Sequence, residues 1–399
     1  MIANIAQQGV AFLGTILIAR LLPAEEFAQV RIAMAYVAVA TILGAGGLTA
    51  PILRYCADPL IDAPQRRRLL GIGLRRLIAI AFLATGAFLG IVIGSGSQGT
   101  EFMVLTAYAL QVPALAATSL LLVYLQAIQR FKFLAYAQIG LRTASFLITV
   151  TACYLHGLPG LLIATLGVVA ASVVPLLHAA RPSFRQLEGD VPGDFTSLAG
   201  YSLLGMVITT IGQYADLMML DWVGAERSDV GVYSLATIFF FAASALAGAV
   251  QSVATPQFTG LIRDRAGFRS SLLRWSVWLM AGGIVVATGA IIVAWLLEVF
   301  FLSEAYSGLS MMVALLMLRF CIWSAYAVGG AAMVGIGAIK QGMAIAFITT
   351  SFAIFIGYPL VLWYGVWGAG IAQVLVAFLT AVLVLRVVVR EAANIPISE

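Results

Sequence analysis

Two arginines lie deep inside long apolar segments, where a charged side chain is costly. Arg142 lies about ten residues into the segment 133–155, and Arg319 lies about eleven residues into the segment 308–338. At ~1.5 Å per helical residue, each lies roughly 15 Å from a segment end. Because an arginine at the centre of a bilayer costs about 2.5–3.5 kcal/mol, both are expected to face a polar interior. Their planar guanidiniums suit bidentate contact with phosphate or sugar, and an internal salt bridge or helix-to-helix hydrogen bond is the structural alternative.

One acid, Asp216, also lies inside an apolar segment, residues 197–222. Thr210, Gln213 and Tyr214 come shortly before it and predict a polar helix face of the kind that lines a cavity. The carboxylate can bind a coupling proton or Na⁺, or it can pair with an arginine. The sequence leaves these roles open.

Two further arginines lie nearer the ends of their segments. Arg54 lies near the inner end of the segment 28–56, where it either extends to the membrane surface or faces a cavity. Arg20 ends the first segment close to Glu25 and Glu26, so an ion-pair network and a guard at the exit of a substrate path are both possible roles. Both are grouped with the two deep arginines as candidate substrate-binding residues.

Uncharged polar side chains complete the candidate cavity lining. Buried amides and hydroxyls need hydrogen-bond partners, which neighbouring helices, water or sugar hydroxyls supply. Gln111 and Gln373 are further polar residues within or near the predicted spans. Helix packing is the alternative role for all of these polar side chains. The candidate lining residues are Gln7, Gln8, Gln138, Thr210, Gln213, Tyr214 and Tyr326.

No metal or cofactor is expected. Cys56, Cys153 and Cys321 are far apart and show neither metal-ligand spacing nor a disulfide framework. The two histidines, His156 and His178, flank helices without partners in the sequence.

The composition requires lipid as the solvent for these segments. The 399 residues are 62% apolar and only 10% charged, with a mean hydropathy of +1.04. A soluble domain carries roughly 25% charged residues. A bilayer is crossed by ~20 apolar residues of helix, and that length predicts an all-α, polytopic membrane protein. The twelve predicted spans are 2–22, 28–56, 74–94, 102–128, 133–155, 160–178, 197–222, 228–255, 272–301, 308–338, 341–363 and 368–389.

The basic residues fix the expected orientation. Of the 22 Lys and Arg residues, sixteen fall in one set of alternate loops, which the positive-inside rule assigns to the cytoplasm. Both termini are therefore expected to be cytoplasmic. This placement in short loops also argues against nucleic acid as the partner of a chain with net charge +5. The sixteen are Arg66, Arg67, Arg68, Arg75, Arg76, Arg130, Lys132, Arg181, Arg185, Arg263, Arg265, Arg269, Arg274, Lys340, Arg386 and Arg390.

The two halves of the chain resemble each other. Residues 154–160, with Gly157 and Gly160, match residues 362–368, with Gly365 and Gly368, at an offset of 208. An even number of helices in each half makes the repeats parallel. We therefore expect a six-helix bundle at 1–180, a polar cytoplasmic linker at 181–196 and a second six-helix bundle at 197–399, around a central cavity.

Short motifs are similar to those of a known transporter family. The segment 18–28, ARLLPAEEFA from Ala19 onward, is followed by a helix that ends in 50–55, APILRY. In the second half, 216–220 (DLMML) and 231–236 (GVYSLA) take the corresponding places. Together they resemble polysaccharide-type flippases of the multidrug/oligosaccharidyl-lipid/polysaccharide exporter (MOP) superfamily, over essentially the whole chain. Ala28 stands where that family usually has Gly.

The resemblance implies a transporter rather than an enzyme. It implies that an undecaprenyl-pyrophosphate-linked oligosaccharide is flipped from the cytoplasmic to the periplasmic leaflet of the bacterial inner membrane, for O-antigen, capsule or exopolysaccharide synthesis. Alternating access, H⁺ or Na⁺ coupling, contact with membrane lipids, and a polysaccharide polymerase and a chain-length regulator as partners belong to the same expectation.

The sequence leaves two alternative functions open. A cation-coupled multidrug antiporter of the same superfamily would need acids in the core of the first half, whereas the only clear acid inside a span is Asp216. A membrane-embedded polysaccharide polymerase or ligase would need a large outer loop, and the outer loops here are short.

Overall fold

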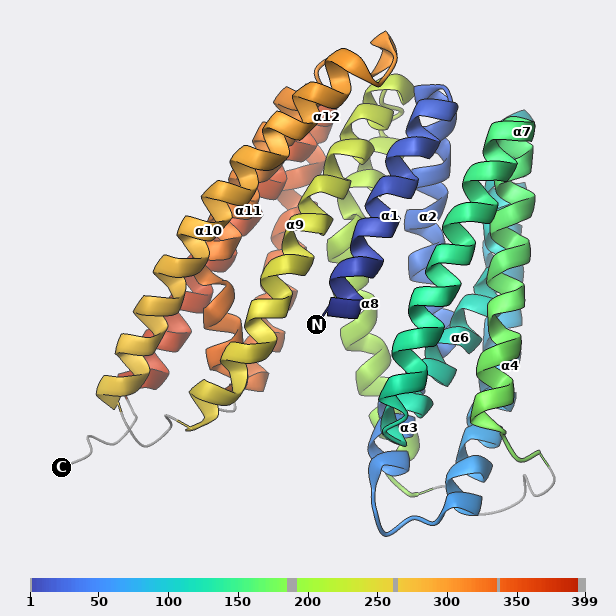
Figure 1. Cartoon of the computed structure of the whole chain (residues 1–399), viewed down its shortest axis with the longest axis vertical. Helices are drawn as coiled ribbons and strands as arrows, with labels where there is room; N and C mark the ends of the chain where they lie inside the picture. The colour runs from blue at the N-terminus through green and yellow to red at the C-terminus, as the bar shows by residue number, and fades with distance from the viewer. Residues whose placement is uncertain (1, 185–191, 261–264, 336–337, 394–399) are drawn as a thin grey trace. The chain divides into compact units, whose positions relative to one another are not determined.

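The computed structural model of the chain describes residues 2–184, 192–260, 265–335 and 338–393 (Figure 1). These residues form helices joined by short turns, and no strand occurs among them. By packing they group into a C-terminal unit, Met1–Ala28 with Gly212–Glu399, and an N-terminal unit, Gln29–Ile211. The predicted division at 181–196 falls partly outside the described residues and stays a prediction.

The N-terminal unit is built around α6 (Val112–Ala127). This helix packs against α3 (Thr49–Ala57), α4 (Ala63–Gly94) and α7 (Phe131–Ala180). The remaining elements are α5 (Gly99–Ala109), most of α2 (Ala24–Ala45) and the first part of α8 (Phe195–Trp222), as far as Ile211.

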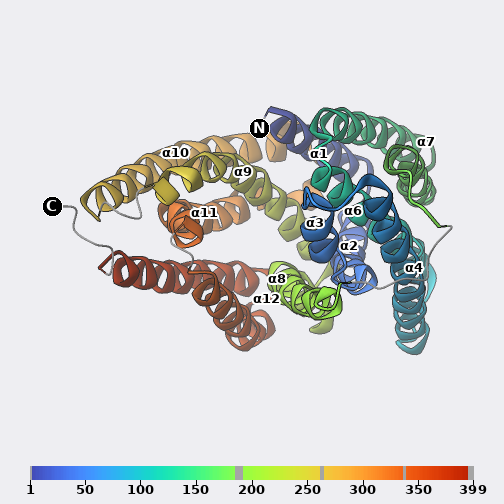
Figure 2. The ribbon, with the colours of Figure 1, turned by 90° about the horizontal axis from the view of Figure 1, so that it is seen from below.

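The C-terminal unit is built around α11 (Leu309–Gly335). It packs against α9 (Arg227–Gly260), α10 (Arg265–Phe300) and α12 (Ile339–Ala393), which Figure 2 shows around it. Helix α1 (Ile2–Leu21) packs on α9, and α8 (Phe195–Trp222) belongs to this unit from Gly212 onward. A short 3-10 helix, η1 (Glu304–Tyr306), precedes α11. At the start of α11, the amides of Gly308 and Ser310 donate to the Glu298 carboxylate at 2.7 and 2.8 Å.

Among the described residues, nine helical segments are long and apolar enough to cross a membrane. One of them, Gly99–Ala127, joins α5 and α6, and α1 adds a shorter apolar helix. Helices α7 and α12, of 50 and 55 residues, each contain two limbs separated by a reversal of the chain. Counted by limb, these segments and α1 supply the twelve predicted spans, and the chain is a multi-pass membrane protein.

The two reversals are alike and lie at the predicted offset of 208. Gly157 has φ 60° and ψ −143°, and Gly365 has φ 54° and ψ −131°, a conformation that only glycine adopts without strain. Three residues later, a Cβ at Gly160 would overlap the Ala152 carbonyl, and a Cβ at Gly368 would overlap the Leu360 carbonyl. The same pair of glycines thus closes the same turn in each half, as the repeat predicts.

The predicted span 28–56 is wrong as a single helix. Gly46 and Gly47 have φ of 57° and 66°, so α2 ends at Ala45 and α3 begins at Thr49. A Cβ on Gly47 would overlap the Ala199 carbonyl of α8, because α8 approaches this turn closely. The break therefore serves a tertiary contact, which the apolarity of the segment does not reveal.

Candidate functional site

Arg319 lies in α11 against an aromatic ring of α9. Its guanidinium carbon is 3.8 Å from the ring centroid of Phe240, and the side chain is half-buried. Phe320, next in sequence, meets the same Phe240 ring edge-on, with centroids 6.4 Å apart. A cation–π contact contributes about 0.5–2 kcal/mol, which alone does not offset an arginine inside a membrane.

Polar groups surround Arg319 at longer range. Asp216, Tyr233 and Tyr326 lie within electrostatic reach of the guanidinium. Within the described part of the chain, however, no hydrogen bond or ion pair involves the guanidinium itself. Its N–H donors are therefore available to water or to an anionic ligand. Tyr326, predicted as a lining residue, is 7% exposed on the same helix two turns further on.

Asp216 is the centre of a buried polar cluster drawn from three helices. It is 5% exposed on α8 and accepts hydrogen bonds from the Tyr233 hydroxyl of α9 at 2.5 Å and from Gln373 Nε2 of α12 at 2.9 Å. The Leu217 amide also donates to it, at 2.8 Å. These neutral donors satisfy the carboxylate, which the sequence had left to an arginine or a cation. Hydrogen bonds to a charged acceptor are stronger than neutral ones, so the cluster fixes the three helices together.

One face of α9 connects the carboxylate and the guanidinium. Tyr233, Thr237 and Phe240 follow one another at helical spacing and are all buried. Tyr233 donates to Asp216, and Phe240, about 10 Å further along the helix axis, supports Arg319. The site is thus an acid beside the first two turns of α9 and a cation about two turns further along that helix.

The other lining candidates on α8 are less buried. Thr210 and Tyr214 are half-buried and Gln213 is exposed. Thr210 belongs to the N-terminal unit, whereas Gln213 and Tyr214 belong to the C-terminal unit with Asp216. No hydrogen bond of their side chains is found among the described residues.

Arg54 lies in the last turn of α3 and binds Asp194, immediately before α8. The Arg54 Nη1–Asp194 Oδ2 distance is 3.1 Å, and the two side chains are 60% and 52% exposed. The Tyr55 hydroxyl donates to the same carboxylate, and the Tyr55 ring stacks on Phe195 with centroids 6.1 Å apart. This contact anchors the start of α8 within the N-terminal unit and leaves part of Arg54 accessible.

Arg20 contacts Phe301, not the two glutamates nearby in the sequence. Its Nη1 donates to the Phe301 carbonyl, and its guanidinium carbon lies 4.3 Å from the Phe301 ring centroid. Glu25 and Glu26 form no ion pair with it in the described part of the chain. The carbonyl follows the C-terminus of α10, where unpaired carbonyls attract a cation. Arg20 thus joins α1 to the C-terminal end of α10.

Arg142 and Gln138 lie on the first limb of α7. Arg142 is exposed, Gln138 is half-buried, and four residues of helix place them on one face. Gln8 is exposed on α1, and the side chain of Gln7 lies outside the described residues.

Sequence reasoning missed Phe240 and the pairing of Tyr233 with Asp216. Phe240 lies in the run Phe239-Phe240-Phe241, which reads as ordinary apolar helix. Gln373 was noted only as a polar residue within a span. The i, i+7 spacing of Tyr233 and Phe240 is the one signal that could have linked them.

Comparisons with known proteins agree on the fold. The model of the polysaccharide biosynthesis protein family matches residues 1–262. A structure of "Lipid II flippase MurJ, inward closed conformation" has a TM-score of 0.77 at 14% identity, over 99% of this chain and 89% of that chain. An inward-facing multidrug resistance MATE family transporter of the MOP superfamily has a TM-score of 0.70 at 14% identity, over 98% and 95%. An outward-facing one has a TM-score of 0.69 at 14% identity, over 99% and 94%.

No curated protein sequence matches the chain. The MurJ and MATE folds have twelve helices in two bundles, which confirms the predicted architecture. The chain belongs to the polysaccharide biosynthesis protein family and has the fold of the MOP superfamily of flippases and exporters.

Proposed function

We propose that the chain flips a polyprenyl-pyrophosphate-linked oligosaccharide from the cytoplasmic to the periplasmic leaflet by alternating access. The observation that carries this proposal is Arg319, a cation inside a span whose N–H donors have no acceptor in the described residues. A pyrophosphate supplies acceptors of matching geometry. The family of polysaccharide biosynthesis proteins supports a sugar cargo.

The charge balance supports an anionic headgroup. Asp216 is already satisfied by Tyr233 and Gln373, so its charge is held in place by neutral donors. Arg142 is exposed and, like Arg319, has no hydrogen bond in the described residues. The deep charges open to a ligand are therefore both positive.

The remaining expectations extend the same proposal. Arg54 and Arg20 bind the headgroup at earlier or later stages of transport, and Asp216 is the candidate residue for H⁺ or Na⁺ coupling. The protein works in the bacterial inner membrane with both termini cytoplasmic, for O-antigen, capsule or exopolysaccharide synthesis, with a polymerase and a chain-length regulator as partners. It catalyses no covalent step.

The test is headgroup translocation in proteoliposomes by an Arg142→Ala/Arg319→Ala double variant. The probe is a fluorescent polyprenyl-pyrophosphate disaccharide, and the matched control is Arg386→Ala/Arg390→Ala, which removes two exposed arginines at the end of α12. We expect the control to flip the probe at the wild-type rate and the double variant to lose flipping while inserting normally. Wild-type translocation by the double variant overturns the proposal.

A cation-coupled multidrug exporter is the second candidate, favoured by the likeness to the two MATE transporters. A fluorescent cationic drug in the same vesicles separates the two functions. We expect no drug transport, because Arg319 repels a cation. Drug transport that depends on Asp216, without flipping of the glycan probe, would establish the exporter instead.

A further inference from the structure

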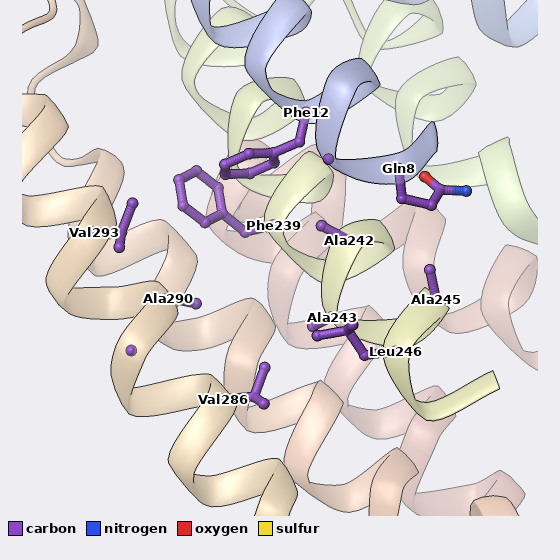
Figure 3. Close-up of a pocket in the computed structure, with 12 residues that line it drawn as sticks. Gln8, Phe12, Phe239, Ala242, Ala243, Ala245, Leu246, Val286, Ala290 and Val293 are labelled. Atoms are coloured by element: carbon purple, nitrogen blue, oxygen red, sulfur yellow. The ribbon is translucent and has the colours of Figure 1, made fainter. Parts of the chain in front are cut away.

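A cavity of about 300 Å³ lies between α1, α9 and α10 of the C-terminal unit (Figure 3). Its wall is apolar except for Gln8 at one edge. Phe12 of α1 and Phe239 of α9 border it together, with perpendicular rings and centroids 5.0 Å apart. An apolar cavity of this size inside a membrane protein accommodates a hydrocarbon ligand.

The cavity is wide because several of the residues that line it are small. Gly9, Ala242, Gly289 and Ala290 line it. A Cβ built on Gly9 or Gly289 meets no atom within 4 Å, so the space beside both glycines is open. Engineered cavities of about 150 Å³ hold a benzene molecule, so twice that volume has room for roughly two five-carbon isoprene units.

The cavity also continues onto the apolar surface of the unit. Leu246 of α9 and Val293 of α10 line it, and each is 41% exposed. A hydrocarbon ligand with one end in the cavity can therefore extend along these exposed apolar side chains into the lipid phase. This is the arrangement required by a ligand of which only one end is bound by the protein.

Helix α9 contacts both the cavity and Arg319 of α11, through two consecutive residues. Phe239 borders the cavity, and the ring of Phe240, the next residue of α9, contacts the Arg319 guanidinium. Consecutive residues differ by ~1.5 Å along a helix axis, so the Phe239 end of the cavity is level with the Phe240–Arg319 contact. They lie about 100° apart around α9, on neighbouring faces. A molecule with an anionic group joined directly to a hydrocarbon chain matches this pair of features.

We propose that this cavity binds the isoprene units next to the pyrophosphate of the polyprenyl carrier, while Arg319 binds the pyrophosphate itself. This inference rests on the proposed function and adds the site of the carrier chain. Because each isoprene unit carries a methyl branch, an isoprenoid chain needs a wider cavity than a straight acyl chain does. The glycines and alanines that line this cavity provide that width. The occupant is therefore the isoprenoid chain and not a phospholipid acyl chain.

The experiment measures binding of three soluble probes to the full chain in detergent: inorganic pyrophosphate, geranyl pyrophosphate and decyl pyrophosphate. Geranyl and decyl chains both have ten carbon atoms along with the same headgroup, but only geranyl is branched. The test variant is Gly289→Leu, which adds a side chain at a wall position where a Cβ meets open space. The matched control is Gly282→Leu, an equally open glycine of α10 that does not line the cavity.

For the wild type and Gly282→Leu, we expect geranyl pyrophosphate to bind at least about tenfold more tightly than decyl pyrophosphate or pyrophosphate. Gly289→Leu should lose the extra affinity for geranyl pyrophosphate and keep its affinity for inorganic pyrophosphate. Equal affinities for geranyl and decyl pyrophosphate would assign the cavity to ordinary acyl chains and overturn the inference. An equal loss in both leucine variants would overturn it too, because the effect would not be local to the cavity. Failure of the wild type to bind inorganic pyrophosphate would instead contradict the proposed function.

Discussion

Arg319 and Phe240 form a cation–π pair between α11 and α9, with the guanidinium carbon 3.8 Å from the ring centroid. The ring holds the cation without using its N–H donors, which a carboxylate partner would occupy. This difference matters for a transporter, because a fully paired arginine has little to offer a passing anion. The pair therefore combines a fixed position with N–H donors that have no acceptor among the described residues.

Replacing Phe240 with Leu should weaken binding of pyrophosphate by about two- to thirtyfold, the range that corresponds to a cation–π contact of about 0.5–2 kcal/mol. The guanidinium remains present but loses its support. Titration calorimetry on the purified chain measures the change. Phe241→Leu is the control, because the Phe241 ring meets the Phe240 ring edge-on, and no ring contact of Phe241 with the guanidinium is found among the described residues. Unchanged affinity in Phe240→Leu would show that the ring does not position the cation.

Replacing Tyr233 with Phe should destabilise the protein by about 1.5–3 kcal/mol, because it removes a hydrogen bond to the buried Asp216 carboxylate. The thermal unfolding midpoint in detergent should fall accordingly. Tyr306→Phe is the matched control, since the buried Tyr306 hydroxyl has no partner among the described residues. That control should be neutral or slightly stabilising, and equal losses in the two variants would argue against the Asp216 cluster.

Replacing Gly160 or Gly368 with Ala should lower the yield of folded protein and destabilise it by about 1–3 kcal/mol or more, because the new Cβ overlaps a backbone carbonyl. Gly167→Ala, on the second limb of α7, meets open space and should be tolerated. The readout is the monodisperse fraction after purification. A large effect in only one half would indicate that the two turns are not equivalent.

The Asp194 carboxylate, immediately before α8, predicts a pH dependence of stability. Hydrogen bonding by the Tyr55 hydroxyl, with help from Arg54, lowers the pKa of Asp194 below its usual value. The carboxylate therefore adds stability above the ordinary aspartate pKa, and this contribution is lost as the pH falls through the lowered value. The difference in unfolding midpoint between wild type and Asp194→Asn should be small at neutral pH, because the pair is exposed, and should shrink as the pH falls below the ordinary aspartate pKa of about 4. A difference that grows towards low pH would contradict this assignment.

Much of the fold follows from the sequence, because hydropathy and the placement of arginines both repeat with the spans. The matching glycines at 157, 160, 365 and 368 also identified the turn shared by the two halves. The break at Gly46–Gly47 was missed, since an apolar segment of sufficient length does not show where another helix approaches it.

The site could be predicted only in part. The depth of Arg319 and Asp216 follows from counting residues within a span. Their partners do not, because Gln373 lies 157 residues from Asp216 in the chain and meets it only through the packing of α12 against α8. The role of Phe240 depends on the rotation of α9 against α11, which an all-apolar stretch leaves undefined.

The most direct test of the central claim is the affinity of the purified full chain for inorganic pyrophosphate before and after Arg319→Ala. Loss of a charge-assisted hydrogen bond of about 1.5–3 kcal/mol corresponds to at least a tenfold drop in affinity. Arg386→Ala, at the exposed end of α12, should bind as the wild type does. Equal pyrophosphate affinity in wild type and Arg319→Ala would contradict the claim that this arginine receives the headgroup.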